Sequence, residues 1–193
     1  YYGLYINASG NGSKIVNGTI HNSTYAIRLN KTGDVTIKLT TINTSRRDAI
    51  LIENAGNINI TNVTIMNTSD VFFDLNITCG GCSGIWITDT NIGNYTINST
   101  GAKLNFRESG QGALEYLVNV NGTGKNLSDV VNITSNNVWV NTSLNNGLNK
   151  SARITFYSIT YTNPEPQYAL LPGASSWVSC TSLTTPACTE ISF

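Results

Sequence analysis

Residues 27–65 read IRLNKTGDVTIKLTTINTSRRDAILIENAGNINITNVTI. Apolar and glycine positions recur in this stretch at an interval of 23 residues: Ile27 and Ile50, Leu29 and Ile52, Gly33 and Gly56, Ile37 and Ile60, Ile42 and Ile65. Between them, Thr, Asn and Lys alternate with the apolar residues, which is the period-two pattern of strands with one buried face. A repeat that contains three such short strands predicts a stack of similar coils.

The pattern extends over four coils, at intervals of 23 residues in the first register and close to it, up to the fourth coil, in the other two. The first register comprises Leu4, Ile27, Ile50 and Phe73, followed two residues later by Ile6, Leu29, Ile52 and Leu75; the second comprises Ile15, Ile37, Ile60 and Ile87; the third comprises Ile20, Ile42, Ile65 and Ile92. Leucine-rich repeats have a similar length of about 20 to 29 residues, but they contain one strand per repeat and Leu at most core positions. The pattern therefore predicts an all-β fold, a parallel β-solenoid with three strands in each coil of about 23 residues.

Over residues 3–107 the pattern resembles the right-handed parallel β-helix family, as found in pectate-lyase-like and surface-repeat proteins. The resemblance implies a right-handed superhelix, in line with the usual crossover rule. We expect Gly10, Gly33 and Gly56 to turn the corners in the left-handed conformation. We assign residues 1–116 to this β-helix, with 107–116 as a cap or linker at its end.

After Phe106 the 23-residue period is lost. Turn clusters separate short strands, which we predict at 117–121, 129–134, 137–143, 152–162, 176–180 and 188–193. Such spacing is typical of a small antiparallel β-sandwich, so we assign residues 117–193 to an Ig-like domain. Residues 147–157 (GLNKSARITFY), 162–166 (TNPEP) and the pair Cys180 and Cys188 resemble a module of large archaeal cell-surface proteins, where it follows β-helix repeats. This resemblance implies an extracellular or cell-surface location and no particular activity.

Charge is scarce in this chain. Its 11 Lys and Arg balance 11 Asp and Glu, and only 11% of residues are charged, against about 25% in an average soluble domain. A nucleic-acid partner is not expected, because a phosphate-binding surface needs a basic excess. No apolar stretch is long enough to predict a transmembrane segment. The chain opens on Tyr1 without Met or a signal peptide, so we expect a processed piece of a longer exported precursor.

Amide and hydroxyl residues take the place of charge: 27 Asn, 25 Thr and 18 Ser. The sequon Asn-X-Ser/Thr occurs at 17 positions: Asn7, Asn11, Asn17, Asn22, Asn30, Asn43, Asn59, Asn62, Asn67, Asn76, Asn94, Asn98, Asn121, Asn126, Asn132, Asn141 and Asn149. Chance would give about 27 × 43/193, roughly 6, at this composition. We expect a densely N-glycosylated exterior, with covalent N-linked glycans and no other cofactor. The alternative is a polar β-surface that happens to satisfy the pattern.

Three of these sequons fall at matching positions of the 23-residue repeat. Asn7, Asn30 and Asn76 are equivalent in this alignment, and Glu53 occupies the missing position. Since stacked coils lie about 4.8 Å apart, we expect the three asparagines to form a column along one outer edge.

The four cysteines form two local pairs, Cys79 with Cys82 and Cys180 with Cys188. We expect two disulfides, because an exported chain is usually oxidised; the alternative is a zinc site built from all four. The first pair lies in an insertion in the fourth coil, since Leu75 and Ile87 are 12 residues apart whereas Ile52 and Ile60 are 8 apart. A disulfide there would stiffen an enlarged corner loop.

No catalytic residue and no metal site are expected. Glu53 and Asp74 could form a carboxylate pair on the first face, but isolated solvated charges are the simpler interpretation. Thr88-Asp89-Thr90 is only weakly similar to a polysaccharide-hydrolase motif. His21 is expected to be a surface residue. Trp86, Trp139 and Trp177 lie on separate predicted strands, where core packing is favoured over stacking on sugar.

Taken together, these features predict an extracellular or cell-surface structural glycoprotein. The chain begins inside a coil and ends in the strand-like Ile191-Ser-Phe193, where the archaeal module would need another strand. Unpaired strand edges are templates for pairing, so we expect a homopolymer, either a filament or a surface layer, joined through terminal strands. A carbohydrate-binding or adhesion module is the first alternative, favoured if aromatic residues line a groove free of sequons. A β-helix polysaccharide lyase or hydrolase is the second.

Overall fold

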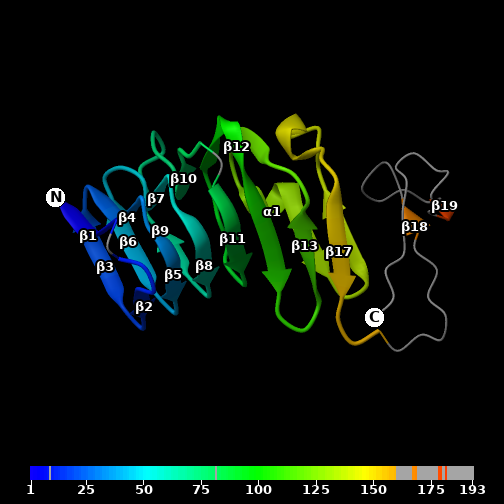
Figure 1. Cartoon of the computed structure of the whole chain (residues 1–193), viewed down its shortest axis with the longest axis horizontal. Helices are drawn as coiled ribbons and strands as arrows, with labels where there is room; N and C mark the ends of the chain where they lie inside the picture. The colour runs from blue at the N-terminus through cyan, green and yellow to red at the C-terminus, as the bar shows by residue number, and fades with distance from the viewer. Residues whose placement is uncertain (9, 81, 160–166, 169–177, 180, 182–193) are drawn as a thin grey trace. The chain divides into compact units, whose positions relative to one another are not determined.

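The computed structural model describes residues 1–8, 10–80, 82–159, 167–168, 178–179 and 181 (Figure 1). Contacts along the chain divide it into two compact units, Tyr1–Tyr157 and Ser158–Phe193. The first unit is an all-β structure that consists of a parallel β-solenoid followed by a small antiparallel sheet.

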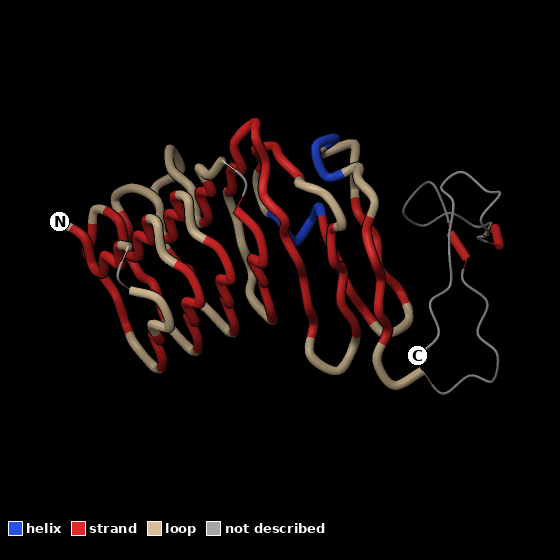
Figure 2. Tube along the Cα trace, in the orientation of Figure 1, coloured by secondary structure: helices blue, strands red, loops and turns tan. Residues whose placement is uncertain are grey.

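Each of the first three coils contributes one strand to each of three faces, and strands of successive coils stack in parallel (Figure 2). The first face comprises β1 (Tyr2–Asn7), β4 (Tyr25–Asn30), β7 (Ile50–Glu53), β10 (Leu75–Ile77) and the first part of β12 (Tyr95–Glu108). The second comprises β2 (Lys14–Val16), β5 (Gly33–Lys38), β8 (Gly56–Thr61), β11 (Cys82–Thr88) and the second part of β12. The third comprises β3 (Thr19–Ser23), β6 (Thr41–Ser45) and β9 (Thr64–Met66).

The predicted registers are confirmed over the first three coils. Leu4, Ile27 and Ile50 pair in sequence, as do Ile6, Leu29 and Ile52, and on the third face Ile20, Ile42 and Ile65. The second face keeps its register through the fourth coil, from Ile15 and Ile37 to Ile60 and Ile87. The central isoleucines of these rows are fully buried, so their stacked side chains form a continuous core along the solenoid axis.

The first face of the fourth coil departs from the predicted register. Leu75 pairs with Ile50 and not with Ile52, and Phe73 is not in the row at all. The corner loop before β10 is two residues longer than the 23-residue repeat allows. Because a shift of two residues keeps inward and outward positions unchanged, the hydrophobic pattern could not reveal it.

The corners are built differently from our expectation. Gly10, Gly33 and Gly56 do not have positive φ. Most of the non-glycine residues in the left-handed region are Asn or Asp. One corner has such a residue in every coil, at Asn17, Leu39, Asn62 and Asp89, and each donates its backbone N–H to a carbonyl of the next coil at 3.0–3.2 Å. Asn and Asp tolerate this conformation better than other residues with a Cβ, which explains why they can replace Gly.

Antiparallel strands close the far end of the solenoid. The long strand β12 passes from the first face to the second and pairs with β13 (Gly112–Tyr116) and β14 (Val120–Gly124); β13 also pairs with β17 (Ala152–Phe156). Between them lie α1 (Leu127–Val130), the hairpin of β15 (Val131–Thr134) and β16 (Asn137–Val140), and the 3₁₀ helix η1 (Asn146–Leu148).

The boundary predicted after Tyr116 therefore does not separate the compact units, because the strands that follow it complete the sheet of the solenoid end. Buried tyrosines hold this region in place: Tyr95 Oη accepts a hydrogen bond from Asn145 Nδ2 at 2.7 Å, and Tyr116 Oη donates to the Leu148 carbonyl at 3.1 Å. Burial raises the pKa of both phenols.

In the second unit the structure describes one antiparallel pair, β18 (Gln167–Tyr168) with β19 (Val178–Ser179). The strand predicted at 188–193 and the pair Cys180 and Cys188 lie outside the described residues. The strand predicted at 152–162 ends at Phe156, and Ser158, two residues later, has a positive φ of 55°.

Candidate glycan-bearing surface

All 17 sequon asparagines belong to the described part of the chain, and none of them is buried. Nine are exposed: Asn7, Asn11, Asn17, Asn22, Asn59, Asn62, Asn67, Asn126 and Asn149. Eight are half-buried: Asn30, Asn43, Asn76, Asn94, Asn98, Asn121, Asn132 and Asn141. By contrast, the buried asparagines Asn105 and Asn145 are not part of sequons. The surface of the solenoid and its cap thus presents a sequon on every coil.

Corner geometry accounts for some of these sequons. Five of the 17 asparagines have positive φ: Asn17, Asn22, Asn62, Asn67 and Asn126. At Asn17 and Asn62 the residue two positions later, Thr19 or Thr64, is the first residue of the next strand. A corner that favours Asn and a strand that favours Thr generate the motif without any glycan. The other twelve sequons have no such conformational explanation.

Several sequon side chains have their carbonyl oxygen fixed by a neighbour. Thr100 Oγ1 donates to Asn98 Oδ1 at 2.9 Å, and Ser143 Oγ donates to Asn141 Oδ1 at 2.6 Å, so in both sequons the hydroxyl residue binds its own asparagine. Asn11 Oδ1 accepts the backbone N–H of Gly33 at 2.8 Å. Such bonds orient the amide while leaving Nδ2, the atom that carries an N-linked glycan, out of the contact.

Two sequon asparagines on adjacent coils contact each other. Asn67 Nδ2 donates to Asn43 Oδ1 at 2.9 Å. A glycosylated asparagine keeps one hydrogen on Nδ2, so this bond is compatible with a glycan at either position.

Asn76 differs from the other sequon asparagines because its amide contacts a buried carboxylate. Its Nδ2 donates to Asp48 Oδ2 at 2.8 Å, and the Asp48 side chain is buried and also accepts the Phe73 backbone N–H at 3.1 Å. The Asn76 Oδ1 atom is itself buried and lacks a hydrogen-bond partner among the described residues. A glycan on Asn76 Nδ2 would leave one hydrogen for this bond but would have to fit beside the buried Asp48 side chain.

The predicted column of Asn7, Asn30 and Asn76 is wrong at its third member. Asn7 pairs with Asn30, and Asn30 pairs with Glu53, but Asn76 pairs with Leu51. The cause is the same two-residue insertion before β10. The column of sequons on this edge thus has two adjacent members.

The predicted disulfide between Cys79 and Cys82 is confirmed, with the two Cα atoms 5.5 Å apart. Both residues are buried at the enlarged corner, and the Ala55 backbone N–H lies 3.2 Å from Cys82 Sγ. This bond removes two of the four ligands of the alternative zinc site. Within the described ranges no three His, Cys, Asp or Glu side chains are grouped to hold a metal ion.

The structure does not pair Glu53 with Asp74. Glu53 forms an ion pair with Arg28 at 2.5 Å, which raises the pKa of the guanidinium, and Asp74 Oδ2 accepts the Gly93 N–H at 2.8 Å. A different pair of carboxylates does come together, Asp89 and Glu108, on consecutive coils. Burial, with a further contribution from Asp89, raises the pKa of Glu108. His21 is exposed, as expected.

A tyrosine–arginine surface covers the outer side of β1 and β4. The Tyr2 ring stacks on Tyr5 and Tyr25 at centroid distances of 5.3 and 5.6 Å, and the Arg28 guanidinium lies over Tyr2 and Tyr5. Sequence analysis missed this surface, although the spacing of 23 between Tyr2 and Tyr25 was a usable signal. The sequon residue Asn30 belongs to it, since Asn30 Nδ2 donates to Tyr5 Oη at 3.2 Å.

The two described tryptophans, Trp86 and Trp139, do not form an aromatic surface of this kind. Trp86 and Trp139 are half-buried, and the Arg107 guanidinium lies over the Trp86 ring at 4.5 Å. Trp177 lies outside the described residues.

Comparison with known protein families, with curated proteins and with solved structures finds no match to this chain. Over the described residues, no helix has the length and apolar character needed to cross a membrane.

Proposed function

We propose that this chain is a heavily N-glycosylated extracellular structural protein whose copies assemble through β-strand edges into a filament or a cell-surface layer. The observation that carries the proposal is the placement of the sequons: none of the 17 sequon asparagines is buried, whereas the buried asparagines among the described residues are outside sequons. With 11% charged residues, glycans would supply the hydration that charge supplies on most surfaces. The resemblance to an archaeal cell-surface module supports the same location.

The assembly part of the proposal rests on the first coil. The outer edges of β1, β2 and β3 have no strand partner within the part of the chain that the structure describes. Large apolar side chains are exposed beside these edges: Tyr2 is 46% exposed, Tyr5 42% and Val16 47%. An open edge with exposed apolar side chains favours pairing with another strand, and head-to-tail pairing that does not close produces a filament.

Electron microscopy of the native material tests assembly. We expect filaments or ordered sheets, and monodisperse monomers would contradict the proposal. Val16→Lys places a charge on the edge strand β2 and is expected to abolish assembly. Val118→Lys is the matched control, because Val118 has nearly the same exposure, 46%, but lies in the loop between β13 and β14. Loss of assembly in both variants would reject the edge mechanism.

Intact mass spectrometry before and after deglycosylation tests the glycan part separately. We expect a native mass well above that of the polypeptide, which deglycosylation returns to the polypeptide value. A native mass equal to that of the polypeptide would contradict this part and leave the assembly test unaffected.

A carbohydrate-binding module is the second candidate, and the exposed rings of Tyr2 and Tyr5, stacked with half-buried Tyr25, favour it. Exposed aromatic rings can stack on sugar faces. Asn30 lies among these rings, however, so this surface is not free of sequons. Saccharide binding that is lost in Tyr5→Ala would support this candidate over the structural one.

A further inference from the structure

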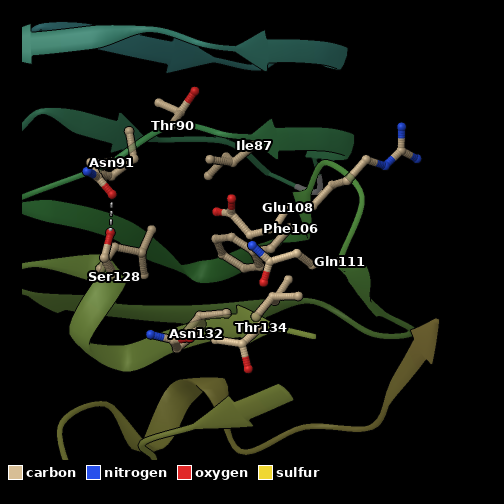
Figure 3. A pocket seen from close by; sticks show the side chains of 14 residues that line it. Ile87, Thr90, Asn91, Phe106, Glu108, Gln111, Ser128, Asn132 and Thr134 are labelled. Carbon is tan, nitrogen blue, oxygen red and sulfur yellow. Dashed lines mark hydrogen bonds between the residues drawn. The ribbon is translucent and has the colours of Figure 1, made fainter. Parts of the chain in front are cut away.

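A cavity of about 290 Å³ lies at the end of the solenoid, between the last coil and the closing segment formed by α1 and β15. The third face ends with β9, and in the following coil the Leu127 backbone N–H at the start of α1 donates to the Ile92 carbonyl at 2.8 Å. The closing segment formed by α1 and β15 leaves the cavity open beside the last coil. Figure 3 shows the cavity with side chains from β11 and β12 on one side and from α1 and β15 on the other.

The wall of this cavity combines an apolar base with neutral polar groups. Ile87, Phe106 and Ile133 supply the apolar part and are almost fully buried. The amides of Asn91, Gln111 and Asn132 lie around it, and Ser128 Oγ donates to Asn91 Oδ1 at 3.1 Å (Figure 3). Amides both donate and accept hydrogen bonds, so the wall matches a ligand whose hydroxyl groups do the same.

Glu108 is the one carboxyl among the described residues that line the cavity, and Figure 3 shows it centrally placed. Burial, and then Asp89, raises the pKa of this carboxyl. Its oxygens can accept hydrogen bonds from ligand hydroxyl groups. Asp89 is held by Ser109, whose backbone N–H donates to Oδ1 at 2.7 Å. The one cation in the lining, Arg107, has its guanidinium over Trp86, so the cavity lacks a group that would select an anion.

We infer that this cavity binds a single ring of a neutral saccharide. Its volume lies at the lower end of the range of small-molecule pockets, about 300–1,000 Å³, which suits one sugar ring. The ring has two sources with the same chemistry, a saccharide from solution or the glycan attached at Asn132, which is both a lining residue and a sequon. The inference does not depend on the proposed structural function.

The test uses the full chain from an expression host that does not glycosylate it. Neutral probes (methyl glucoside, methyl galactoside and N-acetylglucosamine) are titrated against ¹⁵N-labelled protein, with galacturonic acid as the charged comparison. We expect saturable shifts of the Gln111 and Asn132 side-chain amides for at least one neutral sugar, with a dissociation constant of about 1 mM. Gln111→Ala and Glu108→Ala should each weaken binding at least tenfold.

The matched control is Gln167→Ala, since Gln111 and Gln167 are the two glutamines of the chain and Gln167 belongs to the second unit. Should Gln111→Ala fail to fold by circular dichroism, Ser128→Ala and Thr134→Ala replace it. Absence of shifts with every neutral probe at 50 mM, tighter binding of galacturonic acid, or binding unchanged in the cavity variants would each overturn the inference.

Native glycosylated protein then identifies the source of the ring. A glycan at Asn132 that blocks the free sugar, with binding restored by Asn132→Gln, assigns the cavity to the chain's own glycan. An unoccupied Asn132 with the free sugar bound assigns it to an external saccharide. Both results support the saccharide site, whereas a glycan at Asn132 that leaves free-sugar binding unchanged would overturn it.

Discussion

Substitutions at Asn59 and Asn62 separate the conformational role of an asparagine from its role as a glycan acceptor. Both residues are exposed sequon asparagines of the third coil, three positions apart. Asn62 turns a corner with φ of 50°, and its backbone N–H donates to the Thr88 carbonyl at 3.0 Å. Asn59 lies within β8, in extended conformation between Thr36 and Trp86. In the chain without glycans, only Asn62 should matter for stability.

The size of the effect follows from the backbone. The left-handed conformation costs a residue with a Cβ about 1–2 kcal/mol, and Asn recovers part of this through its several-fold preference for the region. Asn62→Ala should therefore lower the free energy of unfolding by about 1 kcal/mol, or about 2–4 °C in Tm for a chain of this length. Asn62→Gly should restore stability, because Gly adopts positive φ without a Cβ clash. Asn59→Ala should change stability by less than about 0.5 kcal/mol.

Thermal and urea unfolding followed by circular dichroism, on protein from a host that does not glycosylate, measures all three variants. Equal destabilisation by Asn62→Ala and Asn59→Ala would refute the corner argument. So would a Gly variant that is less stable than the Ala variant.

Three further predictions concern the Cys79–Cys82 disulfide, the carboxyl of Glu108 beside Asp89, and the half-buried sequon residue Asn76. Replacing Cys79 and Cys82 by Ala should lower the free energy of unfolding by about 2 kcal/mol, because the bond closes only a short loop; chemical denaturation measures this, and a loss above about 4 kcal/mol would contradict it. The folded state holds the Glu108 proton more tightly than the unfolded state, so the free energy of unfolding should fall as pH rises from the ordinary pKa of 4.5 through the raised one. The free energy of unfolding of Glu108→Gln, relative to that of the native chain, should therefore be higher at about pH 7 than at about pH 3.5. An equal difference at both pH values would refute the burial argument. Asn76→Asp should destabilise the chain at neutral pH, because it places a second charge against buried Asp48; an unchanged Tm would show that this contact is not buried in solution.

The repeat made most of the solenoid predictable. Isoleucines such as Ile37 and Ile60 occupy inward positions at a fixed interval, and burial in a stack of coils is the only arrangement that satisfies all of them. The two-residue insertion before Leu75 was hidden because it preserves the inward–outward alternation. The corners were misassigned to glycine because Asn, at positions such as Asn62, adopts the same backbone conformation.

Of the candidate functional features, only those formed by residues close together in the sequence were predictable. Sequons and the Cys79–Cys82 pair are short motifs, so their positions could be read directly. Strands that close the solenoid were also predicted, such as 137–143 and 152–162, but their pairing was not, because the antiparallel pairing of β13 with β17 follows no repeat in the sequence. The cavity combines residues from three separate segments, among them Asn91, Glu108 and Asn132, that only the folded chain brings together.

Site-resolved glycopeptide mass spectrometry of the protein from its native source tests the central claim most directly. We predict glycan on most of the 17 sequon asparagines, including sites among the twelve that are not in the left-handed conformation. Asn76, one of those twelve, is the expected exception, because its amide contacts buried Asp48. Glycan at fewer than about five sites, or only at the five asparagines with positive φ, would show that the sequons arise from backbone and strand preferences and would contradict the glycan-coated structural protein proposed for this chain.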